Sequence, residues 1–258
     1  MRMNDLQKAN FGKRIMSALF DNILLATLAV GIAVVLSLCL GYDAQLDRYT
    51  AILDGYEQEY GINLQIPTAE YESMSQSDKA AYDEAYAAID AALRQDTEYT
   101  ALNLRLLNLR MIILSFSLLA AVLVIEFFVP LLFGNGQTLG KKIFGIGLMH
   151  IEGIRVTGPQ VFIRAVLGKF TVELMLPVYI ALLTLNGGLG IVGPALLAVL
   201  GIVQIICLVI TRTNAPIHDI FASTVAVDFA SQRIFEDRED RDNYIKKIHA
   251  EQAARADY

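Results

Sequence analysis

Charged side chains that lie in or beside long apolar stretches are the residues of this sequence best suited to chemistry. Arg14 and Asp21 stand at the start of one apolar stretch, Glu126 lies inside another, and Glu173 precedes a third. A charge in a bilayer is costly, so such residues commonly bind ions, relay protons or pair with one another. The pattern therefore indicates either a proton or cation site or a network of buried ion pairs.

Arg14 and Asp21 are seven residues apart, which places them on one face of a helix and about 10 Å apart along its axis. This distance is too long for a direct pair, so each side chain needs a partner from another element. We expect Arg164 or Lys169 to pair with Asp21, and Asp219 to pair with Arg14. Two interpretations stay open: these residues bind or gate an ion, or they fasten the helices together.

Glu126 is the deepest of these charges, about 10 Å from the end of its apolar stretch by helical rise. We predict that it binds a proton or a cation. The alternative is a protonated carboxyl group that donates to a backbone carbonyl or to Gln204. Lys169 and Glu173 have the i, i+4 spacing of a helical ion pair, and we expect them to contact each other.

Other kinds of site lack support in the sequence. The glycine- and lysine-containing run at 136–142 does not have the spacing of a phosphate-binding loop, and no predicted strand precedes it. His218 and Asp219 supply too few ligands for a metal, which needs three or four. No nucleophile has a suitable base nearby, and the largest polar segment is acidic, which disfavours nucleic acid. We therefore expect no enzymatic activity, no cofactor, no metal and no nucleic-acid partner.

Four apolar segments are long enough to position these residues inside a bilayer. Residues 23–40 have no charge, residues 111–133 have one, and residues 174–211 have none, although Asn-Gly-Gly interrupts them at 186–188. A span needs roughly 20 apolar residues. We therefore predict an all-α integral membrane protein with four transmembrane helices, at 12–40, 106–133, 161–186 and 189–211.

The charge of the connecting segments predicts their sides of the membrane. Residues 41–100 contain 13 acids and three bases, whereas residues 1–17 and 134–170 are basic. Because basic loops stay in the cytoplasm, both termini are expected there, together with the loop at 134–160. The acidic segment at 41–105 is then extracytoplasmic.

The segments outside the spans have their own patterns. Apolar residues at helical spacing predict that 41–105 is a helical insertion, with a helix that starts at Ser75 and is capped by it. Short β-like runs at 144–151 and 154–157 predict a small hairpin in the cytoplasmic loop. Residues 212–258 comprise a short block around His218 and a charged, helix-prone tail.

Three separated blocks resemble the RDD family of bacterial membrane proteins. They are RIMSALFD at 14–21, GQTLGKKIFGI at 136–146 and HDIFASTV at 218–225, with Arg164 between the last two. The resemblance covers the membrane part and leaves out the acidic insertion and the tail. By motif match, the arginine and the two aspartates of the family name are Arg14, Asp21 and Asp219. The other residues in the family pattern are Gly136, Gln137, Thr138, Gly140, Lys141, His218 and Thr224.

This resemblance implies a multi-pass protein of the bacterial cell membrane, and cation/proton antiport has been proposed for some members. The first hypothesis is therefore transport of a small cation or a proton. Arg14, Asp21, Glu126, Arg164 and Asp219 would be the binding or gating residues. Because four spans leave little room for a closed pathway, a transporter of this size is expected to be a homo-oligomer.

The second hypothesis is a membrane scaffold or accessory subunit. Eight of the 11 tyrosines lie in residues 41–100, and tyrosine is enriched at protein interfaces. The acidic insertion and the tail would then bind a membrane protein partner. The alternative use of these tyrosines, favoured by their helical spacing, is to build the core of the insertion itself.

Overall fold

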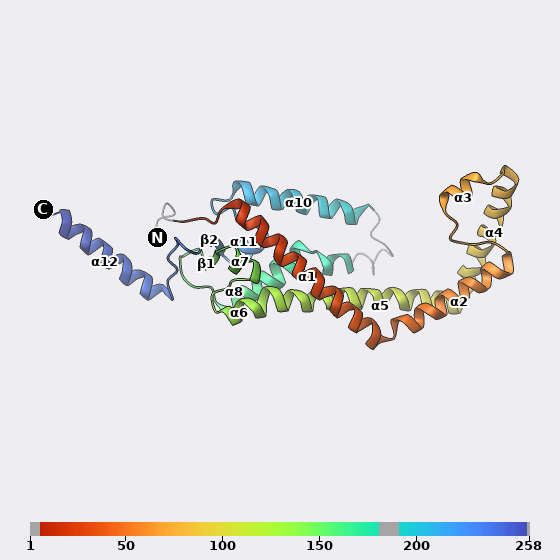
Figure 1. The fold of residues 1–258 in the computed structure, drawn as a ribbon, viewed down its shortest axis with the longest axis horizontal. Coiled ribbons are helices and arrows are strands. Elements are labelled where there is room, and N and C mark those ends of the chain that lie inside the picture. The colour runs from red at the N-terminus through yellow and green to blue at the C-terminus, as the bar shows by residue number, and fades with distance from the viewer. Residues whose placement is uncertain (1–5, 181–190, 257–258) are drawn as a thin grey trace. The chain divides into compact units, whose positions relative to one another are not determined.

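The computed structural model describes residues 6–180 and 191–256, which are mostly helical (Figure 1). The chain forms two compact units. The first unit is drawn from residues 1–32 and 115–258, and the second from residues 33–114. The charged residues of interest all belong to the first unit.

Three helices within the described residues are long and apolar enough to cross a membrane. They are α1 (Phe11–Leu40), α10 (Val192–Ile210) and the continuous helix Thr97–Phe133, which comprises α5 (Thr97–Val122), η2 (Leu123–Phe128) and α6 (Val129–Phe133). Large apolar side chains on α1 and α10, such as Ile23 and Val209, are exposed. Contiguous apolar surface of this kind is typical of a lipid-facing helix.

The predicted third span, 161–186, extends beyond the described residues. Its described part contains the end of α8 (Gly158–Phe162), the π-helix η3 (Ile163–Glu173) and a helical segment at 176–180. Residues 181–186 of this prediction, and residues 189–190 of the predicted fourth span, lie outside the described residues. The count of four spans therefore stays a prediction.

The second unit contains α2 (Tyr42–Tyr60), α3 (Thr68–Ser73) and α4 (Gln76–Gln95), and the beginning of α5. Gly61 ends α2 with a φ of 68°, a left-handed conformation that suits glycine. The predicted cap of α4 is confirmed, because the Ser75 hydroxyl accepts a hydrogen bond from the backbone N–H of Asp78 at 3.2 Å. The acidic segment is thus a helical insertion, as its periodicity predicts.

The tyrosines of the second unit contact one another. Tyr49 stacks on Tyr99 with ring centroids 5.3 Å apart, and Tyr82 packs on both Tyr71 and Tyr86. Aromatic pairs at such distances stabilise a core beyond the area that they bury. The arrangement favours the interpretation that these side chains hold the insertion together.

The first unit contains a two-stranded antiparallel sheet, and the predicted hairpin is formed only in part. Strand β1 (Ile146–His150) pairs along its whole length with β2 (Thr224–Asp228), about 80 residues later in the chain. The segment 154–157 turns back on β1 and forms one antiparallel bridge with it, between Met149 and Arg155, and its Ile154 forms a parallel bridge with Phe235. The physical reason is burial: residues 224–227 are almost fully buried and close the apolar core, whereas residues 154–157 are half-buried or exposed.

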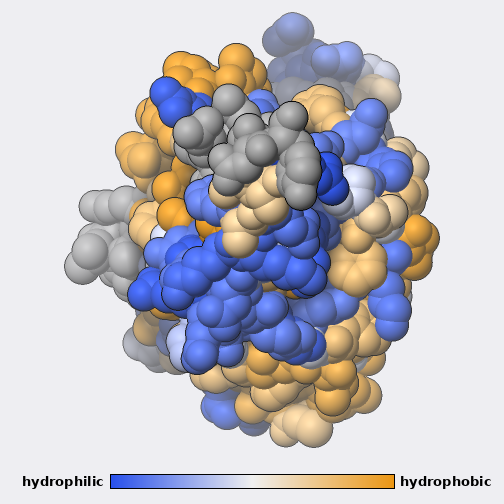
Figure 2. All heavy atoms as spheres, turned by 90° about the vertical axis from the view of Figure 1, so that its left-hand side faces the viewer, coloured by the Kyte–Doolittle hydropathy of each residue, from blue (hydrophilic) through white to orange (hydrophobic). Residues whose placement is uncertain are grey.

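Short helices flank the sheet and the tail follows it. These are α7 (Leu139–Ile143) before β1, α11 (Ile217–Phe221) before β2, and the tail helix α12 (Arg238–Ala256). Figure 2 shows that hydrophilic side chains gather at this end of the first unit and that hydrophobic side chains surround them. The unit therefore has a polar end beside its apolar helices.

Gly168 sets the distance between η3 and α11. A Cβ atom added at Gly168 would lie 2.6 Å from both Cα and Cβ of His218, a separation that real Cβ atoms essentially never show. The two elements can approach this closely only because residue 168 has no side chain. This contact places Arg164 on η3 close to Asp219 on α11.

We predict that Gly168→Ala destabilises the protein by about 1–3 kcal/mol, the usual cost of overpacking. The matched control is Gly201→Ala on α10, where an added Cβ meets no atom within 4 Å. Thermal unfolding of the detergent-purified protein, followed by circular dichroism at 222 nm, measures both. Equal melting temperatures for the two variants would contradict the close approach.

Candidate functional site

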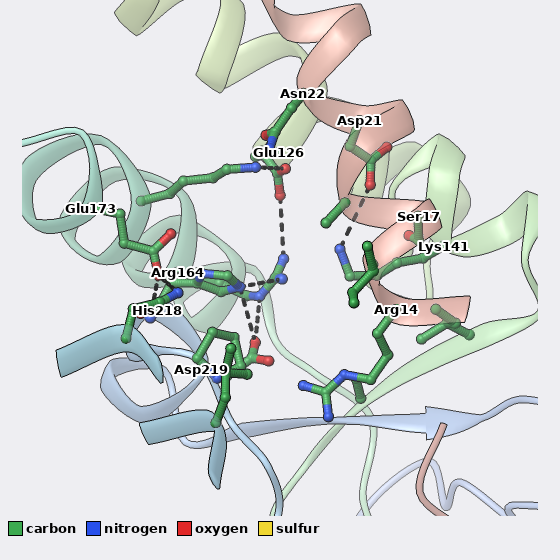
Figure 3. A pocket seen from close by; sticks show the side chains of 18 of the residues that line it. Arg14, Ser17, Asp21, Asn22, Glu126, Lys141, Arg164, Glu173, His218 and Asp219 are labelled. Carbon is green, nitrogen blue, oxygen red and sulfur yellow. Dashed lines mark hydrogen bonds and ion pairs between the residues drawn. The ribbon is translucent and has the colours of Figure 1, made fainter. Parts of the chain in front are cut away.

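A cavity of about 380 Å³ lies in the first unit, among side chains from α1, η2, α7, η3, α10 and α11 (Figure 3). In Figure 3, Asp21, Lys141 and Arg14 lie on one side of it, and Glu126, Arg164 and Asp219 lie on the other. Four carboxylates and four cations line the cavity, together with His218: Asp21, Glu126, Glu173, Asp219, Arg14, Lys141, Arg164 and Lys169. The five residues predicted to bind or gate an ion are thus all at this cavity, but most of their predicted partners are wrong.

The carboxylate of Asp21 is bound by the loop and helix that follow α6. Asp21 is 1% exposed and accepts hydrogen bonds from the Thr138 hydroxyl at 2.5 Å and from the Gly140 backbone N–H at 2.8 Å. Its ion-pair partner is Lys141 at 3.9 Å. The expected pairs with Arg164 or Lys169 are not formed, because both of these cations bind Glu126 on the opposite side of the cavity.

The contacts around this carboxylate account for the residue types of the 136–141 run. Thr138 also caps α7 by accepting from the backbone N–H of Lys141. A Cβ at Gly140 would lie 2.5 Å from the Ser17 carbonyl oxygen and 2.9 Å from the Asp21 carboxylate. The Gln137 side chain is buried and donates to the Ile146 carbonyl at 2.6 Å, which ties the run to β1.

Gly136 completes the turn that opens this run. Its φ is +72°, and an added Cβ would collide with the side chain of Val156. Both observations require glycine. The run is therefore a cradle for Asp21 and not a phosphate-binding loop.

Glu126 is buried and has two cationic partners from η3. Arg164 Nη1 lies 3.4 Å from Glu126 Oε2, and Lys169 Nζ forms an ion pair with Oε1. The alternative of a hydrogen bond to Gln204 is wrong, because the Gln204 side chain donates to Glu173 at 3.1 Å and Gln204 Oε1 accepts from the Ile217 backbone. A carboxylate held between two cations is stabilised in its ionised form.

The π-helical geometry of η3 makes this arrangement possible. Arg164 and Lys169 are five residues apart, which would put them on different faces of an α-helix. In η3 the hydrogen bonds run from i to i+5, as in the 2.9 Å bond from the Leu174 N–H to the Lys169 carbonyl. Such segments are frequent at functional sites, and the sequence shows no signal for them. The expected i, i+4 pair of Lys169 with Glu173 fails for the same reason.

Asp219 is the second aspartate of the site and pairs with Arg164, not with Arg14 as expected. Arg164 Nε donates to Asp219 Oδ1 at 2.7 Å, and the Thr224 hydroxyl donates to the same oxygen at 2.9 Å. Burial works against the ionised form, but the Arg164 charge outweighs burial, and the pKa of Asp219 is lowered to about 2. Asp219 is thus an anion at neutral pH.

His218 connects this pair to Glu173. Its Nδ1 lies 2.7 Å from Glu173 Oε1, and its Nε2 lies 2.9 Å from Arg164 Nη2. A guanidinium can only donate, so Nε2 accepts and the ring proton is on Nδ1, directed to Glu173. His218 therefore bridges the Arg164 guanidinium and the Glu173 carboxylate.

Arg14 binds backbone oxygens. Its guanidinium donates to the Asn214 carbonyl at 2.7 Å and to the Thr213 carbonyl at 3.5 Å, which ties the start of α1 to the segment that follows α10. Within residues 6–180 and 191–256 it forms no ion pair within 4 Å. Its expected partner Asp219 is held by Arg164 instead.

The surroundings of Lys141 work against its positive charge. Burial lowers its pKa to about 8, and repulsion from Arg164 contributes in the same direction. Its ion pair with Asp21, at 3.9 Å, is the longest that a lysine or arginine of the cavity makes among the described residues. Across the described part of the chain, no group of three His, Cys, Asp or Glu is arranged to hold a metal ion.

Comparison with known proteins identifies one family. The model of the RDD family matches residues 8–223, which include every residue that lines the cavity except Ala226. No curated protein and no solved structure matches the chain.

The Asp219–Arg164 pair predicts how stability depends on pH. The folded pKa of Asp219, about 2, lies below its ordinary value of 3.8, so the stabilisation is present above pH 3.8 and is lost as the pH falls toward 2. We expect the melting temperature of the wild type to fall more steeply over this range than that of Asp219→Asn, which has no carboxyl group to protonate. Circular dichroism at 222 nm in detergent measures both, and parallel curves would contradict the assignment.

Proposed function

This chain belongs to the RDD family, and from that premise we propose that it is a multi-pass membrane protein that moves a small cation or a proton by way of the buried carboxylates of its cavity. One observation supports this most: carboxylates from four separate elements converge on one cavity beside helices apolar enough to cross a bilayer. Burying several charges costs free energy, and membrane proteins commonly retain such groups where an ion or proton moves.

The pairing of the carboxylates suggests how an ion could be exchanged. Each carboxylate is already paired with a basic side chain. An incoming cation therefore has to displace that side chain, or a proton has to move between the paired groups. The Asp21–Lys141 pair is the best suited to this step, because it is long and Lys141 gains least from its charge. In the proposal, Glu126 and Asp21 bind the ion, and Arg14, Arg164 and Asp219 control access to them.

The orientation and assembly belong to the same proposal. The basic segments favour a cytoplasmic position for both termini in a bacterial cell membrane. Because so few helices leave little room for a closed pathway, we expect several copies of the chain to associate into a homo-oligomer. The scaffold alternative receives less support, because the tyrosines on which it depends pack against one another in the second unit.

Glu126→Gln tests the proposal in proteoliposomes. We expect loss of sodium, potassium and proton flux driven by a pH gradient, because the amide cannot hold a cation or release a proton. The matched control is Glu59→Gln, the same change at an exposed position of α2, which should leave the flux unchanged. Wild-type flux in Glu126→Gln would contradict the role of this carboxylate.

A double variant separates ion binding from a purely structural role. Glu126→Gln combined with Lys169→Gln removes both charges of one ion pair and so avoids an unpaired buried lysine. Arg164 retains its ion pair with Asp219 in this variant. If Glu126 only fastens helices, the double variant should recover both melting temperature and flux. If Glu126 carries the ion, stability recovers and the flux stays lost.

A further inference from the structure

The volume of the cavity exceeds what a cation or a proton needs. At about 380 Å³ it falls in the range of sites that bind small organic groups, and the share of one water molecule in the liquid is only about 30 Å³. Its lining is also amphipathic. Phe11 and Ile15 from α1 and Leu208 from α10 line the cavity beside the charged residues.

The apolar part of the lining is continuous with surface suited to lipid. Phe11 is 59% exposed and Ile15 is 44% exposed, and both belong to α1, while Leu208 belongs to α10. These two helices are long and apolar enough to cross a membrane. A molecule whose chain lies against α1 and α10 can thus place its polar end in the cavity.

The α1 and α7 side of the cavity carries an excess of positive charge. Arg14 and Lys141 stand there against one carboxylate, Asp21 (Figure 3). Lys141 already pairs with Asp21, and Arg14 forms no ion pair within 4 Å among the described residues, although the charge of Asp219 acts on it at longer range. Its two carbonyl partners use two of the five guanidinium N–H donors and do not neutralise it.

We propose that this cavity binds the phosphate of an anionic phospholipid, with Arg14 as its main ligand and the acyl chains between α1 and α10. A phosphodiester carries a single negative charge, which matches the excess on this side, and arginine binds phosphate through parallel N–H donors. The inference goes beyond the proposed transport and does not depend on it.

The opposite side of the cavity explains why the site selects one orientation of the lipid. Three carboxylates, Glu126, Glu173 and Asp219, stand there with Arg164 and Lys169, and His218 lies between Glu173 and Arg164. This side repels a phosphate and directs it to Arg14. It can accept hydrogen bonds from the hydroxyls of a glycerol headgroup.

A lipid titration of the full-length protein tests the proposal. Dioleoylphosphatidylglycerol is added to the protein in maltoside micelles, and the melting temperature is followed by circular dichroism. Dioleoylphosphatidylcholine and glycerol 1-phosphate form the two comparison arms. We expect saturable stabilisation by phosphatidylglycerol. Apparent affinity should be at least tenfold lower for the zwitterionic lipid and for the soluble headgroup, which lack the net charge and the acyl chains respectively.

Arg14→Gln should weaken the apparent affinity for phosphatidylglycerol by about tenfold, the effect of losing a charge-assisted hydrogen bond. The matched control is Lys13→Gln, which removes the same charge from the neighbouring residue outside the cavity and should change the affinity less than twofold. Equal losses in the two variants would show general attraction to an anionic surface and overturn the site.

The comparison of lipids in the wild type keeps the test decisive if Arg14→Gln does not fold. Equal stabilisation by phosphatidylcholine would overturn an anion site. Equal stabilisation by glycerol 1-phosphate would assign the cavity to a soluble phosphate and overturn the lipid. Arg14→Lys, which keeps the charge and loses the parallel N–H donors, should have an affinity for phosphatidylglycerol between those of the wild type and Arg14→Gln.

Discussion

The fold of the first unit depends on the buried guanidinium of Arg164. It pairs with Asp219 on α11 and with Glu126 on η2, and it donates to His218, so one side chain joins three elements. A buried charge without partners is strongly unfavourable, and removal of one partner typically costs about 3–5 kcal/mol. The elements that carry these partners must therefore pack around η3. Gly168 permits the required approach, because any side chain there would collide with His218.

A second polar contact, between Asp21 and the loop before α7, joins the other side of the cavity. The Asp21 carboxylate accepts from the Thr138 hydroxyl and the Gly140 N–H, and Arg14 on the same helix reaches the segment that follows α10. The two sides are thus assembled independently, each around its own aspartate. The space between them separates two sets of ion pairs: Asp21 pairs with Lys141 on one side, and Glu126 and Asp219 pair with Lys169 and Arg164 on the other. This separation, more than any single residue, creates the cavity.

The five candidate residues lie at one cavity, but the sequence predicts their partners poorly. Charges in or beside apolar stretches indicate Arg14, Asp21 and Glu126, since a charge at such a position must have a use or a partner, whereas Arg164 and Asp219 enter as expected partners and by the family resemblance. Helical spacing likewise predicts the insertion and its cap at Ser75. Partner choice depends instead on the register of η3, where i→i+5 bonding brings Arg164 and Lys169 to the same carboxylate. No residue pattern marks that register, and the pairing of β1 with β2 depends on contacts between distant segments.

Charge balance connects the two uses proposed for the cavity. Proton or cation exchange at the carboxylates changes the charge of the lining by one unit, and a bound phosphodiester would contribute one negative charge beside Arg14 and Lys141. In a medium of low dielectric constant, such charges influence each other over several ångströms. A phosphate on Arg14 would favour the charged form of Lys141 and so stabilise the ion pair between Lys141 and Asp21. Lipid composition would then set how readily the carboxylate is released, and the same excess positive charge that attracts the lipid would link it to the ion.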